Sequence, residues 1–198
     1  MHQADGDSGE GGILVENPGG ASPVLLVCEH GGNRVPARYG DLGVGPDVLS
    51  SHVAWDPGAL AVARGLSAML DAPLVAQTVS RLVYDCNRPP DAPGAMPAVS
   101  EVHAIPGNAN LDAEARAERV RTVYRPFEAC LESHVERHVA RHAAGHASPA
   151  VLTIHSFTPT FHGRPRSVEI GILHGDDRRL ADALLAMAGA GSLYDVRR

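Results

Sequence analysis

Two histidines follow apolar stretches that are typical of buried strands, and their positions indicate metal chemistry. Glu29 and His30 end the run VLLVCEH, and His155 ends the run PAVLTIH. Ligands of open α/β sheets bind outside the carboxyl ends of the strands, so imidazoles from two strands can meet there. Imidazole and carboxylate are ligands of catalytic zinc, which uses three protein groups and leaves one position for water. We therefore predict that His30 and His155 share a divalent metal; the alternative is that each only caps its strand by hydrogen bonding.

A second group of polar residues lies in the segment SRLVYDCNRP. Arg81, Asn87 and Arg88 have side chains that suit the capture of a carboxylate, because guanidinium forms a planar fork and the adjacent amide adds a neutral donor. This pattern predicts an anionic substrate. The alternative, given equal weight, is an internal ion pair of Arg81 or Arg88 with Asp85.

Short apolar segments alternate with longer helical patterns, which predicts an α/β fold with a largely parallel sheet. Gly31 and Gly32 would let the backbone turn closely past a bound ion or substrate. Pro126 should kink the long helix. We expect strands at residues 24–30, 72–77, 149–157 and 168–174, helices at 56–70, 112–142 and 176–189, and a third strand or an ordered extension at 80–87.

Length and composition favour a single domain and argue against several classes of partner and chemistry. The 198 residues fit a single domain at 21–198 behind a flexible tail at 1–20, and the 17 basic against 23 acidic residues give a net charge of −6. No basic block could follow a nucleic acid, no lysine is present to form a Schiff base, and no apolar run approaches a membrane span. Three widely spaced cysteines suggest neither a disulfide framework nor a CxxC metal site, so we expect a cytoplasmic protein. The oligomeric state is open.

Four further histidines recur at every fourth position along the long helical pattern and just beyond it. Such spacing could form a stripe of metal ligands on one side of the helix. We prefer a solvated helix face, because no HExxH-type motif accompanies these histidines. They are His134, His138, His142 and His146.

The motifs EHGGNRVP, HVAWDPGA, SRLVYDCNRP and IHSFTP, in this order, resemble the N-formylglutamate amidohydrolase family. The resemblance covers the chain from about residue 23 to 189. It implies a three-layer α/β/α sandwich around a mixed, mostly parallel sheet, similar to the zinc carboxypeptidases and to the aspartoacylase and succinylglutamate desuccinylase group. It also implies hydrolysis of an N-acyl amide on an acidic amino acid, such as N-formylglutamate.

The resemblance makes His30 and His155 ligands of Zn²⁺ or another divalent metal. The wider zinc group has a glutamate three residues after its first ligand, where this chain has Asn33, a poor zinc ligand that we assign to substrate binding. We expect Asp56 to be the third ligand, with Glu29 as second choice. Asp56 followed by proline could instead cap the helix at 56–70.

The resemblance also assigns the reaction's other groups. Arg81 and the pair Asn87 and Arg88 would grip the substrate carboxylates, and Glu169 or Glu29 would act as general base. Family members usually continue into a segment with an Asn-x-Pro-Tyr motif that these 198 residues lack, so any part of the site built by such a segment should be missing here.

Two other functions remain open at this point. A degenerate relative would bind an acidic metabolite without cleaving it, which fits Asn33 and the absent C-terminal motif. A metal-free hydrolase using Ser156 beside His155 ranks last, because no GxSxG elbow is present and adjacent strand residues point to opposite faces.

Overall fold

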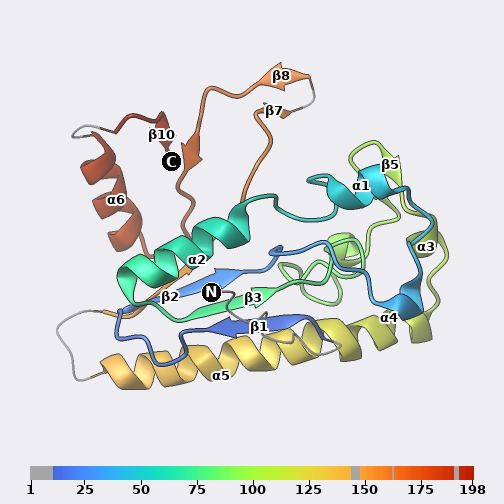
Figure 1. Cartoon of the computed structure of the whole chain (residues 1–198), viewed down its shortest axis with the longest axis horizontal. Helices are drawn as coiled ribbons and strands as arrows, with labels where there is room; N and C mark the ends of the chain where they lie inside the picture. The colour runs from blue at the N-terminus through green and yellow to red at the C-terminus, as the bar shows by residue number, and fades with distance from the viewer. Residues whose placement is uncertain (1–10, 144–147, 162, 190–191) are drawn as a thin grey trace, which may run out of the picture. The chain divides into compact units, whose positions relative to one another are not determined.

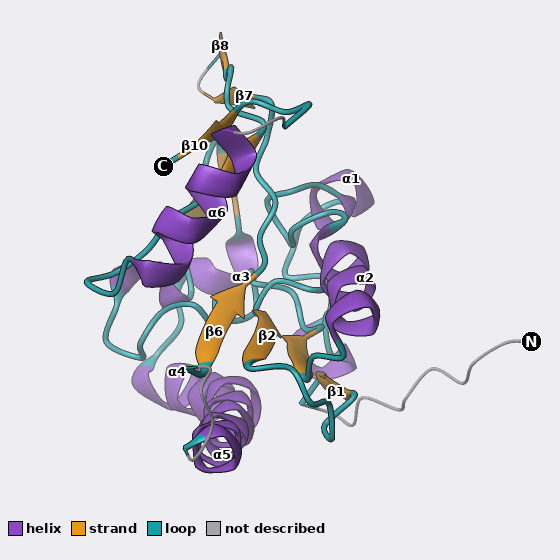
Figure 2. Cartoon of the chain, turned by 90° about the vertical axis from the view of Figure 1, so that its left-hand side faces the viewer, coloured by secondary structure: helices purple, strands orange, loops and turns teal. Residues whose placement is uncertain are grey.

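A four-stranded mixed sheet in the order β1-β3-β2-β6 forms the centre of the first unit of the computed structural model, residues 1–156 (Figures 1 and 2). Central β2 runs parallel to both β3 and β6, whereas β1 is antiparallel to β3. This confirms the predicted mixed, mostly parallel sheet. The strands are β1 (Ile13–Glu16), β2 (Val24–Cys28), β3 (Leu74–Gln77) and β6 (Ala150–Thr153). The structure describes residues 11–143, 148–161, 163–189 and 192–198.

Helices cover both faces of this sheet. Along β2, Leu26 packs in the cluster that contains residues of α2 (Ala59–Leu70), and Leu25 packs in the cluster that contains residues of α5 (Arg125–His142). Neighbouring strand residues point to opposite faces, so the unbroken apolar run of β2 is buried on both sides. The two helices and the sheet make the predicted three layers (Figure 1).

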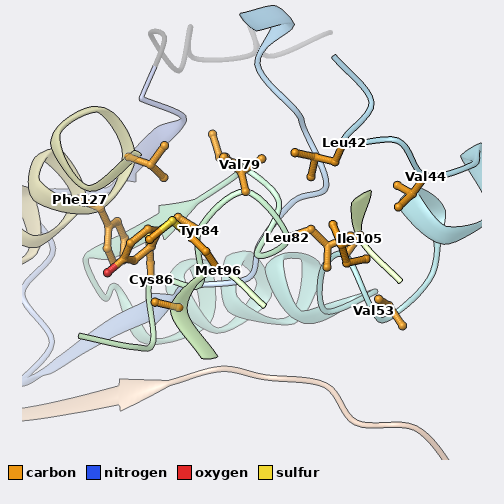
Figure 3. Packing of buried hydrophobic residues seen from close by; sticks show 14 of the residues in the cluster. Leu42, Val44, Val53, Val79, Leu82, Tyr84, Cys86, Met96, Ile105 and Phe127 are labelled. Atoms are coloured by element: carbon orange, nitrogen blue, oxygen red, sulfur yellow. The ribbon is translucent and has the colours of Figure 1, made fainter. Parts of the chain in front are cut away.

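The larger cluster continues beyond the strand ends into the segment that follows β3 (Figure 3). Residues 80–87 form turns and not the strand that we considered, although Leu82 and Tyr84 are almost fully buried. These two side chains pack with Ile105 and Phe127 and fix the segment that carries several site residues.

The long helical pattern is divided into three parts. Asp112 caps α4 (Ala113–Arg119) by accepting a 2.8 Å hydrogen bond from the Ala115 N–H. A π-helical turn, η3 (Val120–Tyr124), then precedes α5. Pro126 lies in the first turn of α5, where its missing N–H costs little.

Short elements complete the first unit of the chain, which spans residues 1–156. The predicted tail at 1–20 includes β1, whose pairing with β3 no sequence pattern indicated. The remaining elements are η1 (Ala37–Tyr39), α1 (Pro46–Ser50), η2 (Pro93–Ala95), β4 (Val99–Ser100), β5 (His103–Ala104) and α3 (Pro106–Ala109).

Residues 157–198 form a second unit with its own small elements. The strand expected at 168–174 is shorter than expected, and the closing helix begins three residues late. The elements are β7 (Thr160–Phe161), β8 (Arg164–Pro165), β9 (Ile170–Gly171), α6 (Arg179–Gly189) and β10 (Val196–Arg197). Among the described residues of the chain, no helix is long and apolar enough to cross a bilayer.

Candidate metal centre and active site

His30 and His155, 125 residues apart in sequence, lie next to each other in the first unit, with ring centroids 5.1 Å apart. His30 follows β2 by two residues and His155 follows β6 by two, and these strands are parallel neighbours. The predicted convergence of the two imidazoles is therefore confirmed. Neither ring caps its own strand, because each is hydrogen-bonded to a carboxylate from a distant segment.

Asp56 joins the two histidines. Its Oδ2 accepts a 2.9 Å hydrogen bond from Nδ1 of His155 and lies 3.5 Å from Nδ1 of His30. The backbone N–H of Ser156 also donates to this oxygen, at 3.3 Å. The helix-cap interpretation of Asp56 is wrong: α2 begins at Ala59, its N-cap is Gly58, and no side chain caps it.

Backbone hydrogen bonds hold the segments that carry these side chains. The Asp56 N–H donates to the His30 carbonyl at 3.0 Å, and the Gly31 N–H donates to the Gln77 carbonyl at 2.9 Å. A Cβ on Gly32 would lie 2.6 Å from the Thr78 carbonyl oxygen. Glycine is thus needed here for close passage along the end of β3, a neighbour different from the ion or substrate that we expected.

Asp85 is a site residue that the sequence interpretation treated only as an ion-pair partner. Its Oδ1 accepts a 2.7 Å hydrogen bond from Nε2 of His30, and the two side chains are 6% and 2% exposed. With the proton on Nε2, neutral His30 presents a lone pair at Nδ1, toward Asp56. The two residues are 55 positions apart, so no spacing rule could have linked them.

The ionisable groups of this cluster shift one another's pKa values. Burial alone would lower the pKa of His30, but the carboxylates of Asp56 and Asp85 outweigh it and raise that pKa. Burial would likewise raise the pKa of Asp56, yet hydrogen bonding to His155 and interaction with His30 hold it well below its usual value. The pKa of Asp85 is lowered against burial by its hydrogen bond to His30.

The donor set fits a divalent metal. His30, Asp56 and His155 each offer a ligand atom, and these atoms lie within 4.8 Å of one another. Zinc ligands lie about 2.0–2.2 Å from the ion, so two of them are at most about 4 Å apart and the site would contract on binding. Nδ1 of His30 is buried without a hydrogen-bond partner, as expected for an atom that faces a cation site.

Glu29 adds a further buried carboxylate to this cluster. Its Oε2 has no hydrogen-bond partner and lies 3.4 Å from Nε2 of His155. Nδ1–H of His155 donates a hydrogen bond to Asp56, so the neutral ring presents the lone pair of Nε2 to Glu29. Glu29, Asp56 and Asp85 carry more negative charge than Arg81 balances, so a cation would relieve the repulsion.

The predicted substrate-binding residues have different surroundings. Arg81 contacts Asp85 and Asp56, so the internal ion pair considered from the sequence is present. Asn33 is exposed, and its Nδ2 donates to the Leu49 carbonyl at 2.9 Å. Asn87 and Arg88 are exposed just beyond Asp85, whose Oδ1 accepts the Asn87 N–H at 3.0 Å. Their contacts with substrate stay a prediction.

Glu169 lies in the second unit, where its Oε2 accepts the Asp195 N–H at 2.9 Å. Its assignment as general base also stays a prediction.

The regularly spaced histidines of α5 do not form a solvated face. His138 is buried, and its Nε2 donates to the Pro23 carbonyl at 2.9 Å, which ties α5 to the start of β2. Nδ1 of His134 lies 2.7 Å from the Cys130 carbonyl on the preceding turn. His146 is outside the described residues. All three cysteines are unpaired, as expected.

The chain is similar to known proteins in sequence and in fold. A family model described as N-formylglutamate amidohydrolase matches residues 22–198. The crystal structure of the gene product Atu2144 from Agrobacterium tumefaciens superposes with a TM-score of 0.88 at 55% identity, covering 96% of this chain and 73% of that one. The N-formylglutamate amidohydrolase from Ralstonia eutropha JMP134 has a TM-score of 0.65 at 21% identity, with 94% and 76% covered, and so supports the fold alone. A comparison with curated proteins gave no match.

Proposed function

Because this chain belongs to the N-formylglutamate amidohydrolase family, we propose that it hydrolyses the N-formyl or other N-acyl amide of an acidic amino acid, using a divalent metal at His30, Asp56 and His155. One observation carries the proposal: three potential ligand atoms from three separate segments lie within 4.8 Å of one another beside carboxylates in excess. We propose zinc as the metal, because two imidazoles and one carboxylate are a ligand set of catalytic zinc. For N-formylglutamate the products are formate and glutamate.

A zinc ion, when bound, would polarise the acyl carbonyl and lower the pKa of water toward ~7. Side chains of the protein would transfer the proton and bind the substrate. Glu29, buried with an unpartnered Oε2, would take the proton of the attacking water and pass it to the leaving amine. Glu169, the alternative base, bonds to the backbone within the second unit. Glu29 is therefore the base that the site geometry favours.

Arg88 and Asn87 would bind the carboxylates of the substrate. Among the described residues, Arg88 forms no ion pair with a protein carboxylate; it is exposed, and its backbone N–H donates to the Asp85 carbonyl at 2.9 Å. The Tyr84 hydroxyl donates to the Arg88 carbonyl at 3.2 Å and fixes the loop. Because the loop is fixed, the Arg88 guanidinium can bind the far end of the substrate and so orient the scissile amide.

Turnover assays test the proposal. Purified protein should hydrolyse N-formylglutamate, lose activity on exhaustive chelation and regain it with Zn²⁺, and parallel assays on N-acetyl and N-succinyl amino acids would define the acyl group. Full activity after complete metal removal would refute the metal mechanism. Tight binding of the acidic metabolite without any product would instead support the degenerate binding protein.

A further inference from the structure

We propose that Arg81 is a positioning residue that clamps the two carboxylates of the metal centre, and does not grip the substrate. This inference rests on the proposed metal site. The resemblance assigns Arg81 to the substrate, but its guanidinium is already shared between two protein carboxylates. Nη2 lies 2.9 Å from Oδ2 of Asp85, and Nη1 lies 3.5 Å from Oδ1 of Asp56.

Each of these carboxylates contacts Arg81 with one oxygen and a histidine with the other. Asp85 gives Oδ2 to Arg81 and Oδ1 to His30, while Asp56 gives Oδ1 to Arg81 and Oδ2 to His155. The guanidinium is therefore linked to His30 through Asp85 and to His155 through Asp56. Because it is rigid and planar, it fixes the orientation of both carboxylates at once.

The backbone beside Arg81 is anchored to the segment that carries Asp56. The Arg81 N–H donates to the Ala54 carbonyl at 3.1 Å, and the hydroxyl of fully buried Ser80 donates to the same carbonyl at 2.8 Å. The Arg81 side chain thus starts from a fixed point two residues from Asp56. Such anchoring is expected of a residue whose task is to hold a neighbouring ligand.

Electrostatics favour the same role. The side chains of Asp56 and Asp85 are each 6% exposed, and two buried carboxylates near one another repel unless a cation lies between them. Arg81 is 31% exposed and supplies that charge from the edge of the cluster. Two of the five guanidinium N–H groups already face Asp85 and Asp56. An end-on grip on a substrate carboxylate through Nη1 and Nη2 would therefore compete with both protein carboxylates.

Zinc affinity and steady-state kinetics of matched variants separate the two roles. With affinity measured by competition against a chromogenic chelator, Arg81→Gln should bind Zn²⁺ about 10- to 100-fold more weakly than the wild type, the range typical for groups that orient metal ligands. Arg81→Lys should lose less, because an ammonium can still neutralise charge but cannot reach both carboxylates in the same geometry. Arg88→Gln should raise KM while its zinc affinity stays near that of the wild type.

Arg64→Gln is the control, because it removes an arginine whose ion pair with Glu16, 48% and 34% exposed, involves no residue of the site. It should change neither zinc affinity nor KM. Unchanged zinc affinity with raised KM in Arg81→Gln would overturn the inference and restore the substrate grip. If Arg81→Gln does not fold, unchanged zinc affinity in Arg81→Lys overturns it equally. A wild-type protein that binds no zinc would refute the proposed function itself, a separate outcome.

Discussion

Asp85 holds His30 in one orientation through a 2.7 Å hydrogen bond between Oδ1 and Nε2, with both side chains buried. The bond leaves Nδ1 of His30 directed to the centre that Asp56 and His155 complete. Asp85→Asn keeps the shape of the side chain but introduces an amide N–H that can donate a hydrogen bond to Nε2. Nδ1 would then carry the proton, so we expect about 10- to 100-fold weaker zinc binding by isothermal titration calorimetry. Unchanged zinc affinity in a folded variant would exclude this role.

Gly32→Ala should destabilise the fold. The new Cβ would lie 2.6 Å from the Thr78 carbonyl oxygen and 3.0 Å from the Thr78 Cα, both backbone atoms. We expect a loss of about 1–3 kcal/mol in the free energy of unfolding, measured by urea denaturation. Gly65→Ala is the matched control, because Gly65 lies inside α2 with open space around it. That change should stabilise the helix by up to about 1 kcal/mol, and equal effects of the two variants would contradict the packing argument.

The stability of the metal-free protein should depend on pH through His30 and Asp85. The pKa of His30 is raised from 6.5, so its stabilising contribution is complete below that pH and is lost as pH rises through the raised value. The pKa of Asp85 is lowered from 3.8, so its contribution is present above that pH and is lost as pH falls through the lowered value. The pair should therefore stabilise the metal-free fold most between these limits.

Thermal unfolding of wild type and Asp85→Asn from pH 3 to 9 measures this contribution as a difference in Tm. The difference should be largest near pH 4–6 and smaller at either end, as follows from the two shifts. Added Zn²⁺ should raise Tm more at pH 8 than at pH 5, because metal ligands must lose their protons. A Tm difference that does not vary with pH would show that the pair does not titrate as described.

Ser156→Ala should keep most of the activity, with kcat/KM within about threefold of wild type. Ser156 contributes its backbone N–H to Oδ2 of Asp56, and alanine preserves that group. A nucleophilic serine, by contrast, could not be removed without near-total loss of rate. Assays on N-formylglutamate decide between the two.

The sequence pattern was informative where chemistry depends on strand ends. The unbroken apolar run before His30 and the strand before His155 were enough to predict that two imidazoles meet, because parallel strands deliver their ends to one edge. The helical patterns also predicted helices, and α2 ends at the predicted residue, Leu70.

The remaining contacts depend on tertiary structure. The pairing of His30 with Asp85, the edge strand β1 and the buried position of His138 each bring together residues from distant segments. No local spacing encodes such contacts. Asp56 illustrates the limit: proline after aspartate suggested a helix cap, but α2 starts three residues later and the carboxylate turns to the histidines.

Direct zinc titration of the metal-free wild type and of His155→Ala, followed by elemental analysis after gel filtration, tests the central claim most directly. We predict one tightly bound zinc per wild-type chain and none retained by His155→Ala, because its loss removes one of the three ligand side chains. Equal zinc content in the two proteins would contradict the assignment of the metal to His30, Asp56 and His155.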